Sequence, residues 1–168
     1  ITQRKKEEMS LEKLAVAVRH TADIIVITDR EGKIEYVNPA FEKLTGYTKE
    51  EAIGKTPRIL KSGKHDLSFY EQLWKTILSG EVFRGVLINK KKDGQLYYSE
   101  KTITPVKDKQ GNIARFVSTD KDITARKQME EELIKSNREL WELDRRRNEF
   151  INMASHELRT PIAIVKEG

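Results

Sequence analysis

The feature that most constrains this chain is the absence of helix-breaking residues from its last third. From Lys121 to Thr160 there is no glycine and no proline, whereas both recur through the residues before Asn112. Glycine and proline interrupt helices because one lacks a side chain and the other lacks a backbone N–H. We therefore expect one long helix, or two, after a strand that ends near Asp120.

Apolar side chains in this run recur at alternating steps of four and three residues. The series is Met129, Leu133, Ser136, Leu140, Leu143, Arg147, Phe150 and Ala154. This is the heptad spacing of a coiled coil, which Ser136 and Arg147 weaken. We predict a parallel homodimer, because the seam has no partner within the chain. The alternative is a single amphipathic helix that packs on its own domain.

Short β-branched segments and short helical patterns alternate before this run. The pattern predicts a helix over residues 1–18 and another over Phe69–Leu78. Asn38-Pro39 and Thr48 with Glu51 are expected to begin two further helices. The expected strands are Ile24–Asp29, Ile34–Val37, Phe83–Lys90, Leu96–Val106 and Ile113–Asp120. This order predicts an α+β fold with an antiparallel sheet covered by helices on one face.

Composition and charge exclude several classes of protein. No apolar stretch is long enough to cross a membrane, no signal-peptide pattern is present, and zero cysteines exclude disulfides and thiolate chemistry. The net charge of +5 comes from residues 55–101, with ten Lys/Arg against five Asp/Glu. That region has no nucleic-acid-binding motif, so we expect no nucleic acid and no membrane contact, and a cytoplasmic location.

Short motifs across residues 20–122 together resemble the PAS family. They are Asp29, Gly32, Ile34, Tyr36–Phe41, Leu44–Tyr47, Lys92–Gly94, Thr104–Val106 and Asp122–Thr124. The resemblance implies a PAS fold, which is a five-stranded antiparallel sheet with helices on one face, followed here by a long coiled-coil helix. It also implies roles in sensing, dimerisation and signal relay.

The light-sensing branch of the family binds flavin and carries a reactive cysteine in a loop that corresponds to Gly54–Lys61. Pro57 stands at the cysteine position here, which excludes the covalent flavin adduct. Asn89 matches one flavin-contacting amide of that branch and is the candidate pocket residue. Ser99 and Asp120 replace the other expected amides.

Two other cofactors stay open as alternatives that we do not favour. Residues 59–106 resemble the redox FAD sites of some bacterial regulators, with Phe83 where several of those carry tryptophan. Haem-binding PAS domains take an axial histidine near the position of His65, but its neighbours are very polar, so we expect His65 to be an exposed loop or cap residue. We expect no required cofactor or metal in this segment, and a pocket that is empty, filled by side chains or open to a small metabolite.

Residues 148–161 closely resemble the phosphoacceptor box of sensor histidine kinases, the start of a HisKA domain. By this resemblance His156 accepts the γ-phosphoryl of ATP and passes it to an aspartate of a response regulator. Glu157 would act as general base or acid, and Thr160 would position the water that hydrolyses the phosphoaspartate. Pro161 is expected to bend the helix just beyond the histidine.

The expected domains are a helical linker over residues 1–19, the PAS sensor over 20–121, a signalling helix over 122–148 and a truncated phosphotransfer helix over 149–168. The pattern I-T-x-R-K occurs at Ile1–Lys5 and again at Ile123–Lys127. This repeat, unless due to chance, makes residue 1 the tail of an upstream module.

These features predict the sensor and phosphoacceptor part of a histidine kinase. Its ATP- and magnesium-binding domain lies outside the segment, so residues 1–168 should be inactive alone. The competing hypothesis is a PAS binding and dimerisation module coupled to another output, such as a cyclic-dinucleotide synthase.

Overall fold

The computed structural model describes residues 2–166, and the side chains of residues 2–159. The chain divides after Thr124 into two compact units. The first unit holds a five-stranded sheet with its helices, and the second is a single helix. Each unit is described by itself.

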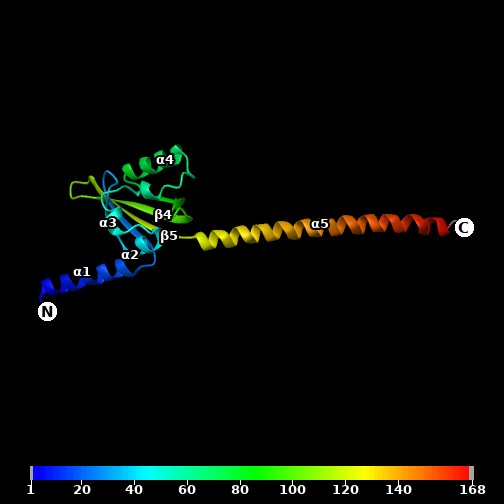
Figure 1. Ribbon diagram of the computed structural model, residues 1–168, viewed down its shortest axis with the longest axis horizontal. Coiled ribbons are helices and arrows are strands. Elements are labelled where there is room, and N and C mark those ends of the chain that lie inside the picture. Colours follow the sequence, from blue (N-terminus) through cyan, green and yellow to red (C-terminus); the bar gives the residue numbers. More distant parts are fainter. Residues whose placement is uncertain (1, 167–168) are drawn as a thin grey trace. The chain divides into compact units, whose positions relative to one another are not determined.

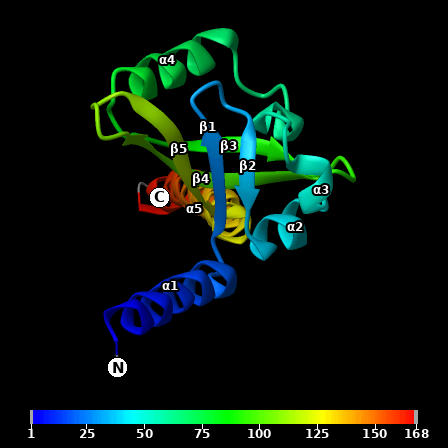
Figure 2. The same cartoon turned by 90° about the vertical axis from the view of Figure 1, so that its left-hand side faces the viewer.

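The sheet is antiparallel throughout, with strand order β2-β1-β5-β4-β3. The strands are β1 (Ile24–Asp29), β2 (Ile34–Val37), β3 (Phe83–Lys90), β4 (Leu96–Lys107) and β5 (Ile113–Asp122). Strands β1 and β5, far apart in the sequence, pair in the middle of the sheet and join its two halves (Figure 2). This confirms the predicted α+β PAS fold.

Helices cover one face of this sheet (Figure 2). They are α2 (Pro39–Thr45), α3 (Lys49–Ala52), the 3-10 helix η1 (Pro57–Leu60) and α4 (Leu67–Leu78), preceded by α1 (Gln3–His20). One apolar cluster lies between α2, α3, η1 and the strands β1 and β2, and a second lies between α4 and the strands β4 and β5. The gap between two separate clusters leaves room for a cavity.

Side-chain caps begin these helices, at Asn38 and Thr48 as the sequence predicts and also at Asp66. Asn38 accepts from the Phe41 N–H at the start of α2, and Thr48 with Glu51 forms a capping box at α3. Asp66 accepts from the Phe69 N–H at the start of α4. Each cap satisfies backbone N–H groups that the first helical turn leaves without partners.

Asn38 also joins three elements, which its sequence position alone does not indicate. Its side chain is fully buried and accepts from the Ile25 N–H at 2.9 Å. Its Nδ2 donates to the carbonyls of Val18 and Asp23 at 3.2 and 3.0 Å. One amide therefore ties the end of α1, the start of β1 and the start of α2 together.

The run without glycine or proline forms one helix, α5 (Thr124–Lys166), drawn from yellow to red in Figure 1. Its start is defined by Asp122, whose Oδ1 accepts from the N–H and hydroxyl of Thr124. The Tyr98 N–H donates to the Thr124 hydroxyl, and Ile123 donates its N–H to the Tyr98 carbonyl. Backbone and side chain thus attach the exit of β5 to β4.

The side chains of Thr160 and Pro161 lie outside the part of the chain whose side chains the structure describes. The expected bend of the helix at Pro161 therefore stays a prediction. None of the helices described over residues 2–166 is both long and apolar enough to cross a membrane.

Candidate functional site

A cavity of about 540 Å³ lies between the inner face of the sheet and the segments η1 and α4. Its walls are mainly apolar, with aromatic rings from Tyr70, Trp74 and Phe116 and aliphatic side chains that include Leu60, Leu73, Ile77, Leu87 and Ile103. Thr28, Asn89, Lys101 and Ser118 add polar groups on the sheet side. A mostly apolar cavity with a few convergent polar groups is typical of a small-molecule site.

A buried ion pair lies at the polar side of this cavity. The Lys101 Nζ lies 2.6 Å from the Asp120 Oδ2, and the two side chains are 9% and 1% exposed. The Ser118 hydroxyl donates to the other Asp120 oxygen at 3.3 Å and accepts from Lys101 at 3.5 Å. Because both charges are removed from water, each requires the other.

The second polar group of the cavity is Asn89, which the sequence indicated as the pocket residue. The structure places its side chain in the cavity wall, 5% exposed, with Nδ2 at 3.5 Å from the Tyr97 hydroxyl. Burial and the nearby charge of Asp120 raise the pKa of Tyr97, so this phenol stays neutral. The long distance leaves the Asn89 amide only weakly engaged.

Ser99 lies on β4, two residues after Tyr97. Its hydroxyl is fully buried and has no hydrogen-bond partner among the described residues. A buried polar atom without a partner is costly. It adds to the polar character of this side of the core.

Trp74 closes the cavity toward the turn between β1 and β2. Gly32 in that turn has φ of +85°, and a Cβ built on it would lie 2.9 Å from the Trp74 ring. The same ring packs edge-on against Phe116, with 6.0 Å between ring centres. Only glycine fits here, on grounds of both backbone conformation and space.

His65 differs from its expectation as an exposed loop residue. It is half-buried, it does not line the cavity, and its Nε2 accepts a hydrogen bond from the Ile88 N–H at 2.8 Å. Nε2 cannot bind iron while it accepts this hydrogen bond, and His65 does not line the cavity. The polar neighbours of His65 indicated exposure. The sequence alone does not show that this loop meets the edge of a strand.

The loop that corresponds to the cysteine-bearing loop of the light-sensing branch, Gly54–Lys61, contains η1. Pro57 is its first residue and lines the cavity. The position that carries the reactive cysteine in the light-sensing branch is therefore at the cavity, and proline there has no thiol to form an adduct.

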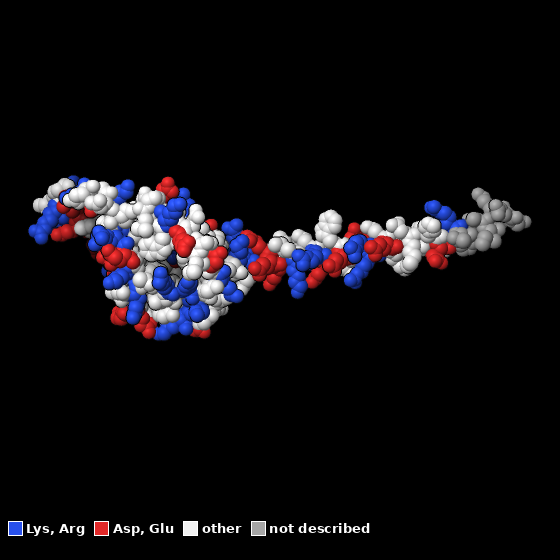
Figure 3. Space-filling model, turned by 90° about the horizontal axis from the view of Figure 1, so that it is seen from above, with Lys and Arg blue, Asp and Glu red and all other residues white. Residues whose placement is uncertain are grey.

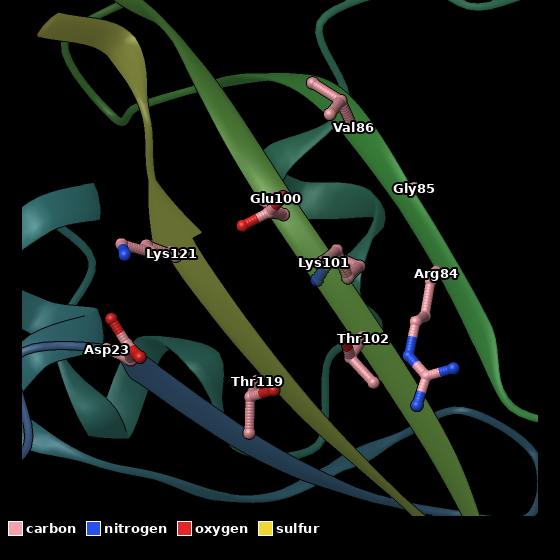
Figure 4. A pocket seen from close by; sticks show the side chains of 9 residues that line it. All are labelled: Asp23, Arg84, Gly85, Val86, Glu100, Lys101, Thr102, Thr119 and Lys121. Carbon is pink, nitrogen blue, oxygen red and sulfur yellow. The ribbon is translucent and has the colours of Figure 1, made fainter. Parts of the chain in front are cut away.

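A second, open groove of about 430 Å³ lies on the uncovered face of the sheet. Figure 4 shows its side chains, which come from β3, β4 and β5 and from Asp23, the residue before β1. Asp23 and Glu100 alternate there with Arg84 and Lys121. Acidic and basic side chains are also mixed over the face of the molecule in Figure 3. The groove shows no single sign of charge.

His156 and Glu157 lie on α5, in the second unit, and both are exposed. Exposure suits a residue that must meet other proteins, and it is also usual for helix surfaces. Thr160, the third predicted residue of this motif, lies outside the described side chains.

Comparison with known proteins agrees with the fold. The model of the family described as "PAS fold" matches residues 12–123, and the chain belongs to this family. In a solved structure entitled "Structure of an RNA-binding Light-Oxygen-Voltage Receptor", the matching region gives a TM-score of 0.68 at 25% identity. The match covers 76% of this chain and 37% of that one.

Relatives of the chain are signalling and regulatory proteins. It is 34% identical over 116 residues to a nitrogen fixation regulatory protein of Klebsiella oxytoca, covering 69% of this chain and 23% of the relative. It is 34% identical over 147 residues to a blue-light photoreceptor of Listeria innocua, covering 86% and 52%. Hybrid signal transduction histidine kinase L of Dictyostelium discoideum is 27% identical over 151 residues, covering 90% and 8%. The chain is thus a PAS signalling segment that spans only part of each relative.

Proposed function

We propose that this chain is the sensor and phosphoacceptor part of a two-component histidine kinase. The observation that carries the proposal is the phosphoacceptor-type sequence around His156, which lies on a continuous helix that starts at the last strand of a PAS domain. The similarity to a histidine kinase over 90% of the chain supports it. The proposed parts are the linker 1–19, the sensor 20–121, the signalling helix 122–148 and the phosphoacceptor helix 149–168.

In this proposal a nitrogen of the His156 imidazole attacks the γ-phosphorus of ATP, and ADP leaves with the electrons of the broken P–O bond. Neutral imidazole is available near pH 7 as a nucleophile. Glu157 accepts the proton that the ring loses. The phosphoryl group then passes to an aspartate of a response regulator. In a separate reaction Thr160 positions the water that attacks this phosphoaspartate, which releases inorganic phosphate and restores the aspartate. The ATP-binding domain of the parent chain supplies ATP and magnesium.

The input is a small molecule in the cavity. Lys101 has further donor capacity beyond Asp120 and Ser118, and the Asn89 amide is weakly engaged, so both can bind a polar edge of a ligand. Asp120 lies on β5 two residues before Asp122, whose carboxylate caps α5. A ligand that moves Lys101 would shift Asp120 and, through β5, the start of α5.

The output requires two chains. The heptad residues Leu133, Leu140 and Leu143 are 59–62% exposed on α5, and burial of such side chains in a parallel homodimer would stabilise the helix. Register change along this seam would carry the signal toward His156.

The proposal is tested in the full-length protein that contains this segment. Incubation with labelled Mg·ATP should give an acid-labile label that His156→Gln abolishes. His20→Gln is the matched control, because His20 is an exposed histidine at the end of α1. Residues 1–168 alone should take up no label. Persistence of the label in His156→Gln, or no label in the parent protein, would favour the PAS module with a different output.

Flavin is a second candidate ligand, because a relative is a blue-light photoreceptor. The aromatic walls and Asn89 fit a planar ring held without a covalent bond, and Pro57 excludes the cysteine adduct. An absorbance spectrum of the purified chain decides this. Bands near those of free flavin that stay unchanged after illumination would identify a non-photochemical flavin site, and a spectrum of aromatic residues alone would exclude flavin.

A further inference from the structure

The loop between η1 and α4 is held to the edge of the sheet by an unusual set of contacts. We call residues 61–66 the strap. Lys61 forms an antiparallel bridge with Asn89, and the Ser62 hydroxyl donates to the Ile88 carbonyl. The His65 Nε2 accepts from the Ile88 N–H at 2.8 Å. Since β3 is an edge strand, the strap supplies partners for backbone groups that have no strand beside them.

The strap also borders the cavity. Lys61 lines it, and so do Leu60 and Leu67 on either side of the strap. The Lys61 Nζ lies 4.7 Å from the centre of the Tyr70 ring, which is a further part of the same wall. Movement of the strap away from β3 would therefore open this side of the cavity.

The contact between His65 and Ile88 depends on the protonation state of the imidazole. A ring nitrogen accepts a hydrogen bond only when it carries no proton, so the N–H donor opposite assigns neutral His65 with its proton on Nδ1. Protonation turns Nε2 into a donor that faces a second donor. The bond that holds the strap is then lost.

Charged groups around the ring belong to the strap itself. Asp66 is adjacent and ionised: the Phe69 N–H and then the Ser68 hydroxyl hold the pKa of Asp66 below its usual range, with a smaller effect of His65. The other charged residues of the strap are Lys61 and Lys64.

Neutral groups meet the ring from the other two elements. From α4, Phe69 stacks on it with 4.3 Å between ring centres, and Tyr70 meets it edge-on at 6.2 Å. Burial raises the pKa of Tyr70, so this phenol stays neutral. From β3 the backbone of Ile88 meets it, and the charged side chains of that strand, Arg84 and Lys90, are exposed. Histidine is the residue type whose charge ordinarily changes near neutral pH, so His65 is the group through which pH can act on this contact.

We propose that His65 is a pH-sensitive latch that controls access to the cavity. Neutral His65 holds the strap on β3, and the stabilisation is lost as the pH falls and the ring takes up a proton. The consequence for ligand uptake rests on the proposed sensor function, whereas the latch itself does not.

The first test measures hydrogen exchange of the Ile88 amide by NMR in residues 1–168, at pH 7.5 and 5.5, as a protection factor. Loss of a hydrogen bond worth about 1 kcal/mol should lower this factor about fivefold at the lower pH. His65→Gln keeps a neutral acceptor and should abolish the change. His65→Arg imposes the charge and should give low protection at both pH values. His20→Gln should respond as the parent does.

The second test measures quenching of Trp74 by acrylamide, a neutral probe, in a Trp141→Phe background. Trp74 lines the cavity, and the chain has two tryptophans, so this variant isolates its signal. Quenching should rise at pH 5.5 in this background and stay constant when His65→Gln is added, with unchanged circular dichroism.

Equal Ile88 protection at both pH values, or an equal fall in His65→Gln, would overturn the latch. A fall in protection without a rise in quenching would overturn its control of the cavity. Neither measurement involves ATP, His156 or a ligand, so its failure is distinct from failure of the proposed function.

Discussion

The two units of this chain differ in how far their side chains are buried. In the PAS unit, polar side chains such as Asn38, Ser99 and Asp120 are buried to within 1% of complete, beside large apolar ones such as Phe41 and Tyr97. On α5, among the described side chains, the large apolar residues are 49–78% exposed. The PAS unit has its own apolar core, whereas the exposed apolar surface of α5 is the surface that the proposed homodimer would bury.

The test with the largest expected effect removes one charge of the buried pair of Lys101 and Asp120. Lys101→Met leaves Asp120 buried without its partner and should lower the free energy of unfolding by about 3–5 kcal/mol. Lys92→Met is the matched control, since its pair with Glu51 lies at the surface and should contribute far less to stability than the buried pair. Urea unfolding followed by circular dichroism measures both. Equal effects of the two variants would show that the buried pair does not distinguish the PAS unit.

The next test compares two asparagines. Asn38→Ala removes the side-chain hydrogen bonds that join α1, β1 and α2, and leaves buried backbone groups unpaired, at a cost of about 3 kcal/mol. Asn148→Ala on α5 removes only an exposed contact with Asp144 and should change stability by less than about 0.5 kcal/mol. The same urea experiment applies. A tolerated Asn38→Ala would mean that α1 is not held by this amide.

The helix is tested through its association. Leu140→Ser should weaken the predicted dimer about 100-fold, because two leucines leave the seam at about 1.5 kcal/mol each. Trp141→Ser is the control: Trp141 is 78% exposed and lies outside the heptad series. Sedimentation equilibrium measures the dissociation constants. A monomeric parent chain, or equal effects of the two variants, would contradict the coiled-coil assignment.

The smallest effects concern two exposed carboxylates. A hydrogen bond from Lys92, with a second from the Thr48 N–H, lowers the pKa of Glu51, and hydrogen bonds from Lys127 and Arg126 lower that of Glu130. A lowered folded-state pKa stabilises the fold above the unfolded-state pKa, and this contribution is lost as the pH falls through the lower value. Both contributions should therefore disappear only in acid.

The two carboxylates differ in how far away in the sequence their lysine and arginine partners lie. Lys92 is distant from Glu51 in sequence, whereas Lys127 and Arg126 are on the same helix as Glu130. Lys92→Ala should raise the pKa of Glu51 and leave that of Glu130 unchanged in a carbon-13 NMR titration. A change in the pKa of both Glu51 and Glu130, or of neither, would show that the contact with Lys92 does not act on Glu51 alone.

Most of the fold was predictable because its signals are local. The strand ranges, the caps at Asn38 and Thr48 and the burial of one face of β4 follow from residue types within a few positions. The interior of the site was less predictable. Alternation places Lys101 on the buried face of β4, which signals that a partner is needed, but Asp120 becomes that partner only when β4 and β5 pair.

His65 is a second residue whose surroundings could not be predicted from the residues next to it in the sequence. Its polar neighbours predicted exposure, and the half-buried imidazole depends on the edge of β3, which lies 23 residues further along the chain. Glu157 and His156 remain predictions from their motif, because exposure on a helix does not by itself define a site.

The sequence alone indicated which of the longer helices and which strands form, that the chain carries PAS motifs and that its last third is helical. Propensity, capping and periodicity act over one or two turns, so they can be read directly. Tertiary structure decided which polar groups meet: the Lys101–Asp120 pair, the junction at Asn38 and the contact of His65 with Ile88. Those contacts join residues that only the sheet order brings together, and their energies depend on burial that no local pattern specifies.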